Sequence, residues 1–135
     1  MSSRRILVSS GTEYEAAVGY SRAVRIGPWV AVSGTTTSRP SDDIAKQTRE
    51  VLQRIANALE EAGAALTDVI RTRIYVTDIA RWREVAAAHA EVFGEIRPAA
   101  TMVEVAALIE PGLLVEIEAD AYAPSSGKSP SSPGR

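Results

Sequence analysis

The sequence predicts a single α+β domain in which a mixed β-sheet carries two helices packed on one face. The chain has 135 residues, 45% of them hydrophobic, which suits one domain with an ordinary core. Short segments with alternating apolar residues predict strands. Two longer segments carry one apolar stripe each at helical spacing. Each helix therefore has one face to bury against the sheet.

The composition narrows the possible functions. A formal net charge of −2 gives no broad attraction to a nucleic-acid backbone. The lack of cysteine excludes thiolate metal sites, and one histidine leaves few imidazole ligands, so we expect no metal and no cofactor. No segment is long and apolar enough for a signal peptide or a membrane span. We expect a cytoplasmic protein that binds neither membranes nor nucleic acid.

Three strands and a helix are predicted in the first half of the chain. The strands span residues 4–8, 22–26 and 29–33. A polar turn at residues 9–13 follows the first strand, and Gly27-Pro28 joins the other two as a hairpin. After a loop, Ser41 is the expected N-cap of a helix that ends at Gly63. The apolar stripe of this helix consists of Ile44, Val51, Leu52, Ile55 and Leu59.

The second half is predicted to contain three strands and the other helix. A strand at residues 69–76 precedes Asp78, which caps a helix that closes at Gly94. Strands at 101–108 and 113–122 flank the turn Glu110-Pro111-Gly112, and we expect them to pair antiparallel. Strand alternation is expected to turn Thr101, Val103 and Val105 toward the helices, and to place Arg71, Arg73, Glu116, Glu118 and Asp120 on the opposite face.

Five short motifs occur in one order: Gly19-Tyr20-Ser21, Val32-Ser33-Gly34, Val76-Thr77-Asp78, residues 97–105 and residues 115–118. Together they resemble the RidA (YjgF/YER057c/UK114) family over about residues 16–123. The resemblance implies a RidA-like (chorismate mutase-like) domain at residues 1–123, assembled as a homotrimer with small-molecule clefts between subunits. Residues 124–135 are rich in Ser, Pro and Gly, and we expect a disordered tail.

The resemblance also implies site residues. Carried over position by position, it assigns Tyr20 and Glu116 to catalysis, with Glu116 holding a water, and places Ser33 and Gly34 in the substrate pocket. An alternative for Glu116 is a structural ion pair with Arg71 or Arg73, and Tyr20 could simply pack.

Three positions depart from the family pattern. Ala100 stands where the family has the arginine that holds the substrate carboxylate, Met102 replaces a cysteine and Ala86 replaces an asparagine. Losing a guanidinium removes a bidentate, charge-assisted contact, and the three changes together make the cleft more apolar. Ala100, Met102 and Trp82 would then form an apolar pocket for a ligand. Arg73 could supply a displaced guanidinium, or it could pair with Glu104, Glu116 or Glu118 within the sheet face.

These departures leave two functions open. The first is a hydrolase, deaminase-like, acting on a reactive imine or enamine, but not a standard 2-iminobutanoate/2-iminopropanoate deaminase. The alternative is a non-catalytic trimer that binds a small-molecule ligand. An endoribonuclease is less favoured, because the net charge is negative and the chain has a single histidine.

Overall fold

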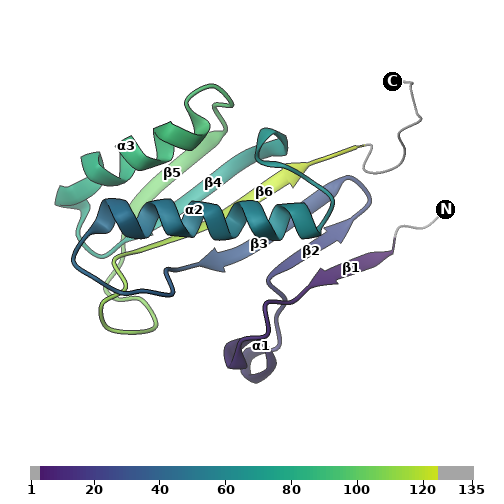
Figure 1. Ribbon diagram of the computed structural model, residues 1–135, viewed down its shortest axis with the longest axis horizontal. Coiled ribbons are helices and arrows are strands. Elements are labelled where there is room, and N and C mark those ends of the chain that lie inside the picture. The colour runs from purple at the N-terminus through teal and green to yellow at the C-terminus, as the bar shows by residue number, and fades with distance from the viewer. Residues whose placement is uncertain (1–3, 125–135) are drawn as a thin grey trace.

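A computed structural model describes residues 4–124 as six strands and three helices, with two short 3-10 turns (Figure 1). The tail expected at residues 124–135 lies, apart from residue 124, outside the described residues. The strands are β1 (Arg5–Val8), β2 (Ala23–Ile26), β3 (Trp29–Thr35), β4 (Val69–Val76), β5 (Ala99–Glu104) and β6 (Val115–Tyr122). The helices are α1 (Glu13–Val18), α2 (Ile44–Glu61) and α3 (Trp82–Phe93). In Figure 1, α2 and α3 lie side by side across one face of the sheet, as the sequence predicts.

The strands form one mixed sheet in the order β1-β2-β3-β6-β4-β5. β4 and β5 run parallel, and the other neighbouring pairs are antiparallel. The core lies between this sheet and the two long helices. Its members include Val32, Ile74 and Ile117 from the sheet and Leu52 and Ile55 from α2. The predicted α+β architecture is confirmed.

The expected β5–β6 hairpin is wrong. β4, α3 and β5 form a strand–helix–strand crossover, which places β5 parallel to β4. β6 then lies antiparallel between β3 and β4. Residues 105–114 therefore connect β5 to a strand that is not its neighbour. Buried Gln47 fixes this connection to α2, because its side chain donates to Gly112 O and accepts from Leu114 N.

The expected orientation of β5 is also wrong. Met102 pairs in register with buried Ile74 and packs against the core, while Thr101 pairs with Arg73 on the opposite face. Thr101 and Val103 therefore point away from the helices. In β4 a register irregularity between Val69 and Arg71 shifts the alternation, so that Val69 is buried and Ile70 is exposed.

The helix starts differ from the predictions in detail. Asp43, not Ser41, caps α2, because its carboxylate accepts from Lys46 N at 3.0 Å. Ser41 instead accepts from Asp43 N. Asp78 begins the second helical segment as predicted, but it caps a short 3-10 turn that leads into α3. Among the described residues, no helix has both the length and the apolar character needed to cross a membrane.

Helix α1 replaces part of the polar turn predicted after β1. Thr12 caps it, and Gly19 ends it in a left-handed conformation. The carboxylate of buried Glu15 accepts hydrogen bonds from Ser10, Ser9 and Thr12. These bonds, with the Ser10 hydroxyl foremost, hold the pKa of Glu15 at about 2. The charged carboxylate thus fastens the preceding loop to α1.

Candidate functional site

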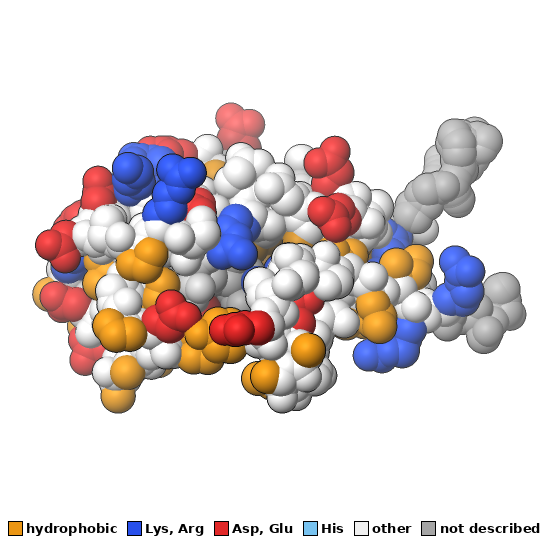
Figure 2. All heavy atoms as spheres, turned by 60° about the horizontal axis from the view of Figure 1, so that its bottom comes forward, with side chains coloured by type: hydrophobic (Ala, Val, Ile, Leu, Met, Phe, Trp, Pro, Cys, Tyr) orange, Lys and Arg blue, Asp and Glu red, His pale blue; other side chains and the backbone are white. Residues whose placement is uncertain are grey.

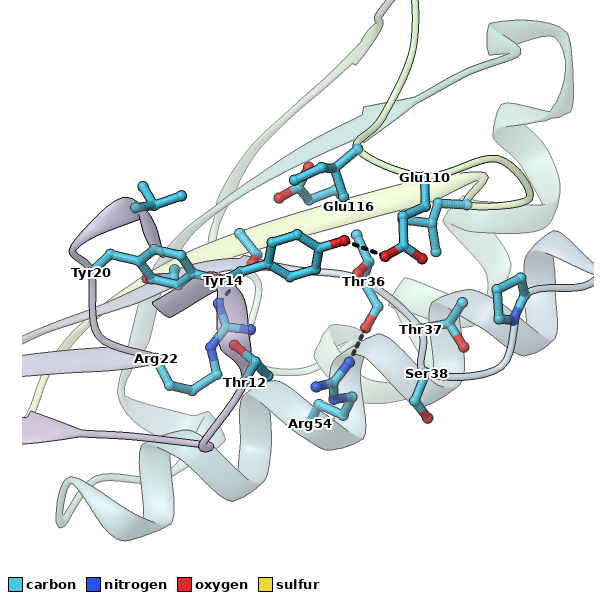
Figure 3. Close-up of a pocket in the computed structure, with 16 residues that line it drawn as sticks. Thr12, Tyr14, Tyr20, Arg22, Thr36, Thr37, Ser38, Arg54, Glu110 and Glu116 are labelled. Carbon is cyan, nitrogen blue, oxygen red and sulfur yellow. Dashed lines mark hydrogen bonds between the residues drawn. The ribbon is translucent and has the colours of Figure 1, made fainter. Parts of the chain in front are cut away.

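A cleft of about 660 Å³ opens at the end of the sheet where β3 leaves its regular pairing with β6. Its walls come from α1, the segment after β3, α2 and residues 109–116, so the cleft joins parts distant in sequence (Figure 3). The lining residues are Thr12, Tyr14, Val18, Tyr20, Arg22, Ser33, Gly34, Thr36, Thr37, Ser38, Pro40, Arg54, Ile109, Glu110, Leu113 and Glu116. Tyr20, Ser33, Gly34 and Glu116, which the sequence pointed to, are brought together here.

Glu116 and Gly34 fit one another. Glu116 alternates with buried Val115 and Ile117, so its side chain leaves β6 on the face away from the helices. A Cβ atom on Gly34 would lie 2.1 Å from Glu116 Oε2. Glycine at position 34 is therefore what lets the carboxyl group occupy this place. Burial, followed by the nearby charge of Glu118, raises the pKa of Glu116, and Arg22 opposes the rise.

Tyr20 and Ser33 lie beside this pair. The Ser33 hydroxyl donates to Ser21 O at 2.6 Å, which ties the end of β3 to the segment before β2. Tyr20 follows α1, and its ring stands 5.8 Å from the guanidinium carbon of Arg22. That spacing is typical of a cation–π contact. Tyr20 is partly exposed, so its hydroxyl is available to a ligand.

The cleft is also lined by two arginines, Arg22 and Arg54, that were not predicted from the sequence as site residues. Arg22 directly precedes β2 and donates from Nη2 to Gly34 O at 2.8 Å. Arg54 reaches from α2 to Thr36 O (Figure 3). For Arg22, the available signal was its position two residues after Tyr20. For Arg54, it was a cation one residue before Ile55 on the buried stripe of α2.

The mouth of the cleft is bridged by Tyr14 and Glu110. The Tyr14 hydroxyl donates to the Glu110 carboxylate, so α1 touches the connection between β5 and β6 (Figure 3). This hydrogen bond is the main cause that raises the pKa of Tyr14.

The other proposed substrate-binding residues lie outside this cleft within one chain. Ala100 is exposed on the edge strand β5, while Met102 packs against the core. Trp82 is exposed at the start of α3, with the Arg83 guanidinium 4.6 Å from its ring. Arg73 pairs with Glu118 at 3.1 Å and Asp120 at 3.0 Å. Arg73 thus forms ion pairs with carboxylates of the same sheet face, which agrees with the alternative of a structural role for this residue.

His89 has a structural environment. Its Nε2 atom lies 3.0 Å from Thr72 Oγ1, and its ring packs 4.8 Å from that of Phe93. Burial lowers the pKa of this histidine. Within residues 4–124, no three histidine, aspartate or glutamate side chains gather closely enough to hold a metal ion. The polar side chains that line the cleft carry carboxyl, phenol, guanidinium and hydroxyl groups.

Comparison with known proteins agrees with this fold. The Endoribonuclease L-PSP family model matches residues 10–123. The crystal structure of Rv2704 from Mycobacterium tuberculosis, described as a member of the YjgF/YER057c/UK114 family, is 69% identical and has a TM-score of 0.86. The similarity covers 89% of this chain and 100% of that one.

Curated relatives point the same way. A RutC family protein of Pyrococcus abyssi is 37% identical over 109 residues, which is 76% of this chain and 85% of the relative. The 3-aminoacrylate deaminase RutC of Acinetobacter baylyi is 40% identical over 80 residues, which is 59% of this chain and 63% of that enzyme. The motifs, the sheet order and these matches together establish that the chain belongs to the YjgF/YER057c/UK114 (RidA) family.

Proposed function

We propose that the cleft binds a small, reactive imine or enamine and promotes its hydrolysis, with Glu116 as general base and Tyr20 as proton donor. The observation that carries this proposal is the position of the Glu116 carboxyl group. It is half-buried against Gly34, its pKa is raised, and Tyr20 lines the same cleft. A raised pKa suits a carboxylate that must take up a proton near neutral pH.

The proposed reaction balances with water alone. Glu116 accepts a proton from water as the water oxygen bonds to the carbon of the C=N group. Tyr20 donates a proton to the nitrogen and regains one from the Glu116 carboxyl group. The carbinolamine hydroxyl then gives its proton to Glu116, Tyr20 gives a proton to the amino nitrogen and regains one from Glu116, and the C–N bond breaks to release a carbonyl compound and ammonia. An enamine enters the same sequence after it tautomerises to the imine, which adds a proton at carbon and removes one from nitrogen.

The substrate is proposed to differ from the standard 2-iminobutanoate and 2-iminopropanoate. Ala100 has no donor for a carboxylate, and the cation of Arg73 already has two carboxylate partners. We further propose that the chain forms a cytoplasmic homotrimer in which Ala100, Trp82, Met102 or Arg73 of a neighbouring copy approaches the cleft. A mass measurement in solution tests the trimer, and a monomeric mass would contradict it.

A second candidate is a trimer that binds a small molecule without converting it. Ala100 favours this candidate, because a cleft that lacks the usual carboxylate anchor could keep its shape and lose turnover. An endoribonuclease, the activity named in the family model, is favoured least. Charged side chains of both signs are interspersed on the face shown in Figure 2, so this face offers no broad cationic surface for RNA.

The test is ammonia release from imines generated in situ by an amino-acid oxidase, with a panel of amino acids as imine sources. We expect the wild type to accelerate hydrolysis of some imines, and Glu116→Gln to lower kcat about 100-fold or more. Glu84→Gln, an exposed carboxylate on α3, is the control and should keep full activity. No acceleration by the wild type, together with saturable binding of an imine product, would favour the binding protein.

Ala100→Arg sharpens the choice of substrate. We expect this variant to gain activity on 2-iminobutanoate relative to the wild type, because a guanidinium can hold the carboxylate. If the wild type already hydrolyses 2-iminobutanoate and the added arginine changes nothing, residue 100 does not decide substrate choice.

A further inference from the structure

Arg22 is a buried cation whose hydrogen-bonding capacity is largely unused. Its relative exposure is 8%, and burial lowers its pKa. Nη2 donates to Gly34 O, Nε is buried without a hydrogen-bond partner, and Nη1 forms no hydrogen bond with residues 4–124. A buried guanidinium with open donors is costly, because the water it has lost is not replaced. An anionic ligand that accepts from Nη1 would compensate part of that cost.

Three neighbouring carboxylates form hydrogen bonds elsewhere. Glu15 accepts from the loop before α1, and Glu110 accepts from Tyr14. Glu50 accepts from Thr37 and Ser38. In the part of the chain that the structure describes, neither Arg22 nor Arg54 forms an ion pair. Within the described residues, the cleft therefore contains two guanidinium groups that form no ion pair, although Arg22 lies close enough to Glu116 to affect its pKa.

Arg54 adds a second cation to the same wall. It is half-buried on α2, and its Nη1 atom donates to Thr36 O, just after β3. Both arginines thus donate to backbone carbonyls of one segment, Gly34 and Thr36, and that contact fixes each side chain at the cleft (Figure 3). Such anchoring lowers the conformational cost of binding an anion.

We propose that Arg22, assisted by Arg54, is the subsite that binds the carboxylate of an acidic ligand in this cleft. The inference rests on the proposed function in one respect, since it takes the cleft to be the ligand site. A planar guanidinium fork matches a carboxylate in shape and charge. A phosphate dianion is disfavoured, because Glu110 and Glu116 line the same cleft and would repel its second charge.

This subsite changes the interpretation of the alanine at position 100. The acid group is bound by residues of the β2 and α2 region, not by position 100. A ligand held there presents its reacting carbon to Glu116 from a different wall of the cleft. The missing arginine then indicates an acid other than 2-iminobutanoate and 2-iminopropanoate, with its carboxylate placed at Arg22.

The test is a binding measurement that needs no turnover. Butanoate and butanamide have the same shape and differ in charge. Each is titrated against the full chain while the backbone amide signals of Gly34 and Thr36 are followed by NMR. We expect butanoate to bind at least 10-fold more tightly than butanamide. Arg22→Gln should weaken butanoate at least 10-fold and leave butanamide unchanged, and Arg54→Gln should weaken butanoate about 3-fold.

Arg49→Gln is the matched control, because Arg49 lies on the same helix but pairs with Glu91 away from the cleft. It should bind both probes as the wild type does. If Arg22→Gln does not fold, Arg22→Lys and Arg54→Gln decide the matter. Lysine keeps the charge but loses the fork, and we expect it to weaken butanoate by less than 10-fold.

Three outcomes would overturn the proposal. Equal binding of butanoate and butanamide to the wild type would show that the cleft does not prefer an acid. A preference that survives in both Arg22→Gln and Arg54→Gln would place the anion elsewhere. Tighter binding of inorganic phosphate at the same amides would replace the carboxylate with a phosphate. Glu116→Gln should still bind butanoate more tightly than butanamide. Loss of turnover in this variant can therefore be distinguished from loss of the carboxylate subsite.

Discussion

Two buried arginines, three residues apart at β2, have opposite environments. Arg25 is 5% exposed and Arg22 is 8% exposed. Arg25 donates to four backbone carbonyls, those of Gly27, Ala62, Gly63 and Ala123. Arg22 donates to one, that of Gly34. The buried fraction is therefore similar for the two arginines. What distinguishes them is the number of guanidinium N–H groups that have no acceptor among residues 4–124 of the protein.

The positions of the two side chains explain the contrast. Arg25 reaches the C-terminal end of α2, where unpaired carbonyls and the negative end of the helix dipole favour a cation. Arg22 points to the irregular end of β3, where the sheet opens into the cleft. One end of β2 is thus closed by hydrogen bonds, and the other is left open for a ligand.

The largest effect is expected on stability at the closed end. Arg25→Met should lower the free energy of unfolding by about 3 kcal/mol, because four carbonyls lose a charged donor. Chemical denaturation measures this loss. Arg22→Met is the matched control and should stay within about 1 kcal/mol of the wild type, since it removes a cation with one partner. Equal losses in the two variants would remove the distinction between the arginines.

The second effect concerns Gly34 at the open end. Gly34→Ala should force the Glu116 carboxyl group aside, because the new Cβ would lie 2.1 Å from Oε2. The atom displaced is the end of a flexible side chain, so we expect little loss of stability. Imine hydrolysis should fall about 100-fold. In an NMR titration, the pKa of Glu116 should move toward its ordinary value as the group becomes more exposed.

A double variant checks that these effects share one cause. Adding Gly34→Ala to Glu116→Gln should cost no further activity, because the carboxylate is already gone. Additive losses, or an unchanged Glu116 titration in Gly34→Ala, would mean that Gly34 acts in another way.

The smallest effect is the pH dependence contributed by Glu116. Its folded pKa is raised, so its contribution to stability is fully present below the ordinary value of 4.5 and is lost as the pH rises through the folded pKa. Gln at this position does not titrate. The stability of Glu116→Gln relative to the wild type should therefore increase with pH across that window. A constant difference from pH 4 to pH 8 would argue against a raised pKa.

Much of the fold could be predicted, because alternation and helical stripes directly report which faces are buried. The hairpin at Gly27-Pro28, both long helices and the acidic face of β6 are confirmed. The predicted orientation of β5 was wrong because Met102 and Val103 are both apolar, so alternation alone could not decide which of them faces the helices. Its pairing partner was missed because a Pro-Gly turn suggested a hairpin, whereas β4, α3 and β5 form a crossover.

The site could be predicted in part. Tyr20, Ser33, Gly34 and Glu116 sit in motifs, and they meet in one cleft. Arg22 and Arg54 belong to no such motif, and their role depends on donors left unused after folding. Whether a donor finds an acceptor depends on contacts in the folded structure, and residue spacing along the chain does not predict those contacts. Ala100, Trp82, Met102 and Arg73 remain predictions that depend on a neighbouring copy.

The most direct test of a ligand-binding Arg22 is a crystal structure of the chain with butanoate. We expect the carboxylate to lie within hydrogen-bonding distance of Arg22 Nη1, with Arg54 on the same side and the alkyl chain toward Tyr20 and Glu116. A carboxylate that lies instead beside Ala100 or Arg73, with Arg22 still unpaired, would contradict the account.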